Sequence, residues 1–107
     1  MSDMGEYEIL SHVSLPECSI RIIRLGEQEH VAPHYHELCT QIYTVLERQI
    51  EANVGDRTFQ LRPYETVRVE KRTVHSIRAV SEPALIMSLS IPPLERDDQH
   101  VAEETQL

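Results

Sequence analysis

The feature that most constrains how this chain folds is a series of short apolar runs, each broken after a few positions by glycine, proline or polar residues. Within the runs, β-branched and polar residues alternate, which is the pattern of a half-buried β-strand. The body of the chain lacks the ~3.6-residue apolar repeat of an amphipathic helix. The runs predict strands over residues 18–25, 34–36, 41–46, 50–54, 58–61, 66–69, 74–80 and 84–91. Short strands at this close spacing indicate an all-β sandwich or barrel.

Turn-forming residues mark the ends of these strands. Gly26 stops the first strand, and a polar loop over residues 27–33 follows it. Turns are expected at Gly55-Asp56, Pro63-Tyr64 and Glu82-Pro83. Pro92 and Pro93 end the last strand because neither can donate a hydrogen bond to a sheet. Residues 94–107 are expected to form a short helix or to stay unordered.

Composition describes one soluble globular domain over residues 1–107. The length fits a single domain, and hydrophobic residues make up 40% of the chain. The formal net charge is −8, with carboxylates concentrated in the two ends, 1–8 and 95–107. Because no basic stripe is present, nucleic acid is not an expected partner. No apolar run approaches the ~20 residues of a membrane span, and the first residues do not read as a secretory signal.

The chain has two cysteines, Cys18 and Cys39. They could form one disulfide, but without an export signal free thiols in a reducing cytoplasm are expected. We therefore expect a cytoplasmic protein in which Cys39 is a buried, inert thiol. Since the chain has no Trp and a single Phe, its core must be aliphatic.

Three of the six histidines stand where a sheet can bring them together. His34 and His36 are two positions apart on an extended segment, so both rings leave the same face with Cα atoms ~6.5 Å apart. Imidazoles at that spacing can converge on one metal ion. His75 lies beyond two turns, and antiparallel strands can return it to the same place, while Gln41 offers a side-chain oxygen. Taken alone, the first two histidines are more often surface residues than ligands.

The residues around these histidines resemble the two sequence motifs of the cupin family. Residues 34–47 (HYHELCTQIYTVLE) resemble the first motif, G-x5-H-x-H-x3,4-E-x6-G. Residues 63–75 (PYETVRVEKRTVH) resemble the second, G-x5-P-x-G-x2-H-x3-N, in their spacing. The resemblance covers roughly residues 26–79. It implies a double-stranded β-helix, or jelly-roll, barrel with a metal site inside it.

The sequence departs from both motifs at several positions. Gln41 stands where the family usually has glutamate, and Arg48 replaces the glycine that closes the first motif. In the second motif, the usual Gly, Pro, Gly and Asn are replaced by Tyr64, Glu70, Arg72 and Ala79. A type II Pro-Gly turn needs a positive φ at its second central residue. With Tyr64 there, we expect a type I turn.

By position, the resemblance implies His34, His36, Gln41 and His75 as ligands of one divalent ion, either iron, manganese, nickel, zinc or copper. Three neutral imidazoles and an amide would leave the site at about +2, where a glutamate would leave about +1. Such a site favours an anionic ligand. The alternative is a degenerate site whose histidines serve only polar packing.

Four further residues are weaker candidates for the site. Tyr43 has the strand parity of Gln41 and is a candidate proton donor, or else a core tyrosine with a satisfied hydroxyl. Met87 and Leu89 alternate along a strand, and they either fill the barrel or form the apolar wall of a pocket. Arg68 is a candidate for holding an anion, although an exposed arginine on an outer sheet face is commoner.

Three functions remain open on the sequence. The first is a metal-dependent enzyme, a dioxygenase or an isomerase or lyase, acting on a small anionic or oxygen-rich metabolite. The second is a sensor-like module that binds a small molecule without turning it over, and the third is a metal-free scaffold. Because a small half-open barrel leaves strand edges exposed, we also expect a homodimer.

Overall fold

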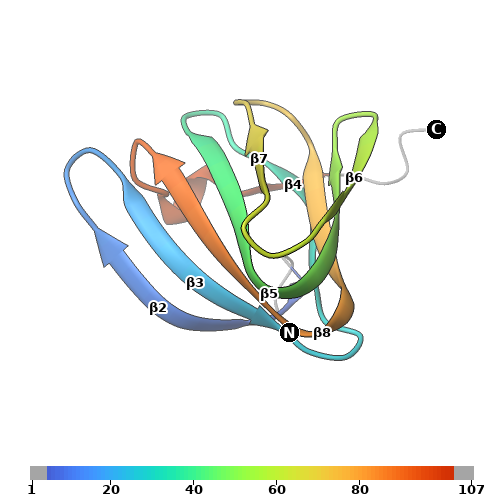
Figure 1. The fold of residues 1–107 in the computed structure, drawn as a ribbon. Helices are drawn as coiled ribbons and strands as arrows, with labels where there is room; N and C mark the ends of the chain where they lie inside the picture. Colours follow the sequence, from blue (N-terminus) through green and yellow to red (C-terminus); the bar gives the residue numbers. More distant parts are fainter. Residues whose placement is uncertain (1–4, 103–107) are drawn as a thin grey trace.

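The computed structural model describes residues 5–102, which are mostly β-strand (Figure 1). The strands are β1 (Gly5–Glu6), β2 (Glu8–Ser14), β3 (Ser19–Leu25), β4 (His30–Tyr35), β5 (Thr40–Val54), β6 (Arg57–Leu61), β7 (Thr66–Val69), β8 (His75–Ile91) and β9 (His100–Val101). A short 3-10 helix, η1 (Arg96–Asp98), lies between β8 and β9. The predicted all-β fold is confirmed. Among the described residues, no helix has the length and apolar character needed to cross a membrane.

Two long strands, β5 and β8, form the spine of the fold. They pair antiparallel from Thr40 opposite Ile91 to Val54 opposite His75. The first half of β8 also pairs with β4 and its second half with β3, while β5 pairs with β7 and then β6. β2 extends the sheet beyond β3, and β1 and β9 both join β4. The sheet therefore curls around a common interior (Figure 1).

The interior is aliphatic over most of its extent. Leu25, Val45, Ile50 and Ile86 are completely buried, and each contributes roughly 1.5–3 kcal/mol through burial of its side chain. Along β3 and β8, the inward-facing pairs change from apolar to polar. The successive pairs are Leu25 and Ala84, Ile23 and Ile86, Arg21 and Ser88, and Ser19 and Ser90. The aliphatic core thus gives way to a polar region inside the barrel.

Several element boundaries differ from those predicted. No turn forms at Glu82-Pro83, because β8 continues through these residues, and only its register against β5 shifts there. β5 likewise joins the strands predicted at 41–46 and 50–54. β4 begins at His30, inside the predicted loop, since β1 and β8 supply partners for its polar segment. All seven residues of β2 are exposed, so no alternation marks that strand in the sequence.

The ends of the chain are only partly described. The tail predicted as a short helix or an unordered segment instead forms η1 and β9 within the described residues. Residues 1–4 and 103–107, which belong to the two acidic ends, lie outside the described part of the chain.

Three residues that replace motif glycines adopt the left-handed backbone that glycine favours. The angle φ is +69° at Arg48, +73° at Tyr64 and +63° at Arg72. The type I turn expected at Tyr64 is therefore wrong, because the position has the positive φ of a type II turn. A non-glycine residue there costs roughly 1–2 kcal/mol in backbone strain. These three positions thus keep a backbone conformation that glycine adopts without strain, although none of them is glycine.

Candidate metal centre

Strand pairing brings the three predicted histidines together. β4 and β8 run antiparallel with His34 directly opposite His75, and His36 follows the end of β4. The ring centroid of His34 lies 4.1 Å from that of His75 and 4.9 Å from that of His36. The centroids of His36 and His75 are 5.3 Å apart. One ring nitrogen of each histidine lies within 4.8 Å of the other two, which is close enough for a shared ion.

Backbone carbonyl groups fix the orientation of all three rings. The Nδ1 atoms of His34 and His75 donate to the carbonyl groups two residues earlier, at Ala32 (2.7 Å) and Thr73 (2.9 Å). The Nδ1 atom of His36 donates to the carbonyl of Asp98, also at 2.7 Å. These bonds assign the proton to Nδ1 and leave the Nε2 lone pair of each ring directed at the common centre. A histidine that binds a metal through one ring nitrogen usually donates the N–H of the other nitrogen to a group such as a backbone carbonyl.

Burial keeps these imidazoles neutral. His34, His36 and His75 are each no more than 3% exposed. Burial lowers the pKa of His34 to about 4, with the neighbouring His36 adding to the effect. Burial, together with the proximity of His34, lowers the pKa of His75 to about 3. Burial also lowers the pKa of His36. All three are therefore in the neutral form that a metal ion requires.

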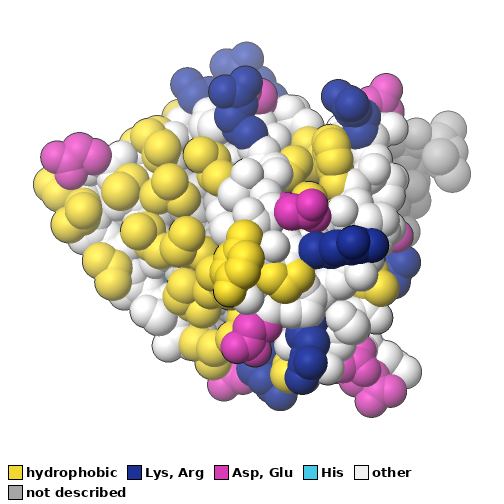
Figure 2. All heavy atoms as spheres, viewed as in Figure 1, with side chains coloured by type: hydrophobic (Ala, Val, Ile, Leu, Met, Phe, Trp, Pro, Cys, Tyr) yellow, Lys and Arg dark blue, Asp and Glu magenta, His cyan; other side chains and the backbone are white. Residues whose placement is uncertain are grey.

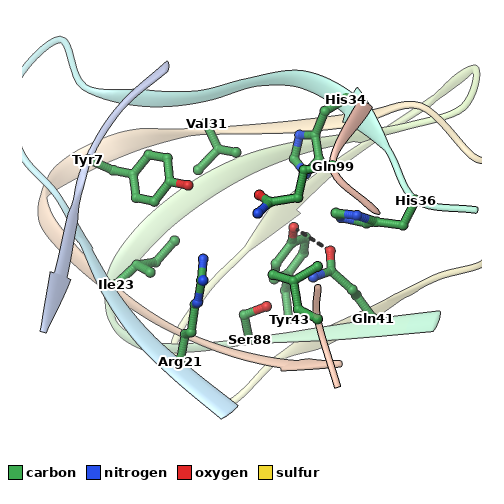
Figure 3. Close-up of a pocket in the computed structure, with 11 residues that line it drawn as sticks. Tyr7, Arg21, Ile23, Val31, His34, His36, Gln41, Tyr43, Ser88 and Gln99 are labelled. Atoms are coloured by element: carbon green, nitrogen blue, oxygen red, sulfur yellow. Dashed lines mark hydrogen bonds between the residues drawn. The ribbon is translucent and has the colours of Figure 1, made fainter. Parts of the chain in front are cut away.

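Gln41 completes the cluster with an oxygen of fixed orientation. It lies on β5 opposite Ser90 of β8, and its Nε2 donates to the Ser90 hydroxyl at 2.9 Å. The Tyr43 hydroxyl donates to Gln41 Oε1 at 2.9 Å (Figure 3). With the amide held at both ends, Oε1 stands 3.1 Å from His75 Nε2. Since His75 carries its proton on Nδ1, two electron-rich atoms face each other at that distance.

The four side chains fit a divalent cation. The Nε2 atom of His36 is buried and has no hydrogen-bond partner among residues 5–102. The Nε2 lone pair of His75 likewise receives no proton from Gln41 Oε1, which is itself an acceptor of the Tyr43 hydroxyl. Buried polar atoms in this state are costly and require an explanation. A cation bound at ~2.0–2.2 Å from each ligand would satisfy all of them.

Asp98 is a supporting residue that the sequence does not reveal. Its carboxylate is 3% exposed and accepts hydrogen bonds from the backbone N–H groups of Glu37 (2.8 Å) and Leu38 (3.0 Å). Its own carbonyl holds His36, as described above. Asp98 thus ties the C-terminal segment to the turn that carries a ligand. In the sequence it stands beside Asp97 in an acidic stretch typical of a solvated tail.

A narrow cavity of about 30 Å³ leads to the histidines (Figure 3). The cavity is lined by buried residues, among them His34, His36, Gln41 and Tyr43, and by half-buried residues of three other segments. The residues that line it are Tyr7, Arg21, Ile23, Val31, His34, His36, Gln41, Tyr43, Ser88, Leu94 and Gln99. Among the predicted weaker candidates, only Tyr43 lies in this cavity. Burial raises the pKa of its hydroxyl, so that group keeps its proton.

The other weaker candidates lie elsewhere. Met87 and Leu89 are half-buried on the outer face of β8, because Ser88 and Ser90 occupy the inward positions of that strand. They neither fill the barrel nor line the cavity. Arg68 has a 70% exposed side chain and pairs with Glu70 at 2.7 Å, so it too lies away from the cavity.

The cysteines are free thiols, as expected. Cys39 is 1% exposed and lies close to His36 and Asp98. Burial, assisted by the nearby Asp98 carboxylate, raises the pKa of Cys39 to about 11. Because a metal ligand must be deprotonated and this thiol keeps its proton, this second group of side chains suits a metal ion less well than the three histidines.

Several solved structures share this fold at low sequence identity. KdgF from Halomonas sp. is 23% identical with a TM-score of 0.70, and the match covers 92% of this chain and 87% of that one. An uncharacterized conserved protein with a double-stranded β-helix domain from Klebsiella pneumoniae is 14% identical with a TM-score of 0.75, covering 97% and 89%. A structure of the DMSP lyases RdDddP and RnDddQII is 17% identical with a TM-score of 0.69, covering 80% and 44%. At these identities the similarity shows the double-stranded β-helix fold alone.

A family model shows the family of the chain, which these structures do not. No curated protein matches the sequence. The model of the Cupin domain matches residues 21–92, a segment that runs from β3 to the end of β8 and contains all four side chains of the cluster. The chain therefore belongs to the cupin family.

Proposed function

We propose that this protein binds one divalent metal ion through His34, His36, His75 and Gln41. The observation that carries the proposal is a pair of buried imidazole nitrogen atoms without a donor among the described residues: His36 Nε2, which has no partner there, and His75 Nε2, which faces the acceptor Gln41 Oε1 at 3.1 Å. Three imidazoles and an amide oxygen suit iron, nickel, zinc or copper, and also manganese. A metal-free scaffold would leave these buried acceptors without compensation.

The proposed ligand of this centre is a small anionic or oxygen-rich metabolite. Within the described part of the chain, no aspartate or glutamate lines the cavity, and all four proposed metal ligands are neutral. A divalent ion there would keep its full charge and act as a Lewis acid on an oxygen atom of the bound molecule. The narrow cavity restricts that molecule to a few atoms at the metal.

The proposed chemistry is an isomerase or lyase step, or dioxygenation, on such a metabolite. Tyr43 is the residue of this chain best placed to hold a proton near the centre, since its hydroxyl already donates to Gln41 Oε1. The lyase relatives among the solved structures support this class through the fold alone.

A second candidate, a binding module without turnover, is favoured by one observation. Among residues 5–102 the cavity lining contains no carboxylate, and its two histidines, His34 and His36, are taken up as ligands, so a general base is missing. Product formation from a panel of small hydroxy acids and oxo acids distinguishes the two functions. Turnover that follows metal content supports the enzyme, and saturable binding without turnover supports the module.

Metal content tests the proposed centre directly. Protein purified without a histidine tag is expected to hold about one transition-metal ion per chain, measured by inductively coupled plasma mass spectrometry. The double variant His36→Ala, His75→Ala is expected to hold none. The matched control is His30→Ala, which removes an exposed histidine from β4, the strand that precedes His36, and keeps the metal. If the wild-type chain takes up no divalent ion even after dialysis against each of the five metals, the centre does not exist.

We also propose that two copies of the chain associate through the outer face of the sheet. Val13, Ile20, Leu89 and Ile42 are successive cross-strand partners on β2, β3, β8 and β5. Cross-strand partners project to the same side, so they form an apolar row, with Ile22 and Met87 in the next row. Figure 2 shows hydrophobic side chains gathered over this part of the molecule. A self-complementary apolar face of this kind suits a two-fold dimer.

Light scattering coupled to size-exclusion chromatography tests the dimer. The wild-type chain is expected at twice its monomer mass of 12.4 kDa. Val13→Glu places a charge at the β2 end of the apolar row, at a residue that is 54% exposed, and is expected to give monomer. Val74→Glu, at a 41% exposed position outside that face, is the control and should remain dimeric. A wild-type mass of one chain would reject the dimer.

A further inference from the structure

Arg21 is a charged residue inside the barrel that the proposed centre does not use. It lies on β3 with its side chain on the inward face, opposite Ser88 of β8, which in turn lies opposite Tyr43 of β5. An inward row therefore runs from Arg21 through Ser88 to Tyr43, and Tyr43 contacts Gln41. Figure 3 shows the guanidinium group pointing into the same cavity that reaches the histidines.

This guanidinium group has no counter-ion within the described part of the chain. None of the ion pairs formed by residues 5–102 includes Arg21. Its Nε donates to Nδ1 of His12, a neutral acceptor on β2, at 3.1 Å. That bond fixes the side chain near the sheet and leaves the terminal nitrogen atoms available. Arginine in a partly buried position is normally matched by a carboxylate or phosphate, with two parallel hydrogen bonds.

The surroundings of Arg21 also favour an anion. The other polar groups of the cavity outside the metal cluster are the Tyr7 and Ser88 hydroxyls and the Gln99 amide, each of which can donate a hydrogen bond. They come from three separate segments and face the cavity together (Figure 3). Among residues 5–102, no carboxylate of the lining repels a negative ligand, although the whole protein carries a formal charge of −8. Within this described lining, Arg21 is thus the one charged side chain.

We infer that Arg21 binds the carboxylate of the ligand whose second oxygen group reaches the metal centre. The inference rests on the proposed function only for the oxygen group of the ligand that reaches the metal. It assigns the ligand to a class: a small carboxylic acid with a carbonyl or hydroxyl group a few bonds from the carboxylate. Arg21 is then the residue that selects the acid over its uncharged analogues, and Ser88 lies between the two ends.

Calorimetry with pyruvate and methyl pyruvate tests this assignment, because the two probes share a carbonyl and differ in charge. On the Ni²⁺-loaded wild-type chain, pyruvate is expected to bind at least ~10-fold more tightly than methyl pyruvate. Arg21→Gln is expected to remove this preference and to keep the metal content, while Arg21→Lys keeps part of it. The matched control is Arg24→Gln, which removes an exposed arginine from the same strand and should leave the preference unchanged.

The outcomes separate this inference from the proposed metal centre. A preference for pyruvate that survives in Arg21→Gln overturns the role of Arg21, as does the absence of any pyruvate binding to the wild-type chain. Metal content is measured on the same samples, so failure to hold nickel counts against the centre alone. In that case the comparison is repeated on chelator-treated protein, where Arg21 is expected to maintain a weaker preference for the acid that Arg21→Gln abolishes.

Discussion

The metal-free protein is expected to lose stability steeply as the pH falls from about 6.5 toward 4. Burial lowers the pKa of His34 to about 4 and that of His75 to about 3, from an ordinary value of 6.5. In this window the unfolded chain binds protons at both residues and the folded chain does not, so the free energy of unfolding rises with pH. Two such groups together contribute roughly 2–3 kcal/mol per pH unit between pH 6 and 5.

An effect of this size is a large part of the ~5–15 kcal/mol that stabilises a typical domain. Urea denaturation followed by circular dichroism in the presence of a chelator, at pH 7, 6 and 5, measures it. His75→Gln is expected to reduce the slope by about half, whereas His30→Gln, at an exposed position, should leave it unchanged. Equal unfolding free energies at pH 7 and pH 5 would contradict the assigned burial of neutral imidazoles.

Bound metal is expected to oppose this acid sensitivity near neutral pH. A cation binds the neutral imidazoles of the folded chain and has no preformed site in the unfolded one. The difference in stability between metal-loaded and chelator-treated protein should therefore be largest near pH 7. It should persist while the imidazoles of the folded chain stay neutral, and fall as the pH passes through about 4 and 3, where protons compete for Nε2 of His34 and His75.

The sequence predicts the strands and the cluster because both follow from local pattern. Alternation of apolar and polar residues identifies β3, β7 and most of β5 and β8. A two-residue spacing on an extended segment places His34 and His36 on one face whatever the rest of the fold. The return of His75 depends on the antiparallel pairing of β4 with β8, which the family motifs anticipate.

The sequence misassigns the outward and inward faces near the site for a physical reason. Apolar residues are expected inside a barrel, which favours Met87 and Leu89 as interior residues. In the polar region of the interior, polar residues face inward instead: Ser88, Ser90 and Arg21 do so, and the apolar residues between them face outward. The same reversal thus produces both the polar cavity and the apolar outer face proposed as a dimer contact.

The local sequence pattern also cannot predict backbone strain or contacts between residues far apart in the chain. Nothing in the composition of the loop shows that Tyr64 adopts a positive φ, since surrounding strands β5 and β7 impose the turn. Asp98 contacts Glu37 and Leu38, 61 and 60 residues away, through backbone N–H groups that any residue type would supply. No sequence signal marks such a contact.

Replacing Asp98 with alanine is expected to weaken both the fold and the metal centre. The change removes the acceptor of two backbone N–H groups, each bond to a carboxylate being worth about 1.5–3 kcal/mol. It also loosens the segment whose carbonyl orients His36 through Nδ1. Loss of such support typically lowers metal affinity by about 10–100-fold. We therefore expect a lower thermal midpoint for Asp98→Ala and a weaker affinity for Ni²⁺ in a competition titration with a chromophoric chelator.

A neighbouring carboxylate provides the control for this prediction. Asp97 lies on the same 3-10 helix but is exposed, so Asp97→Ala makes the same change in charge without removing a backbone acceptor. It is expected to match the wild-type chain in both measurements. Asp98→Asn, which retains one carbonyl acceptor, should fall between the two. If Asp98→Ala instead melts and binds nickel like Asp97→Ala, the carboxylate does not position His36, and the ring is held by β4 alone.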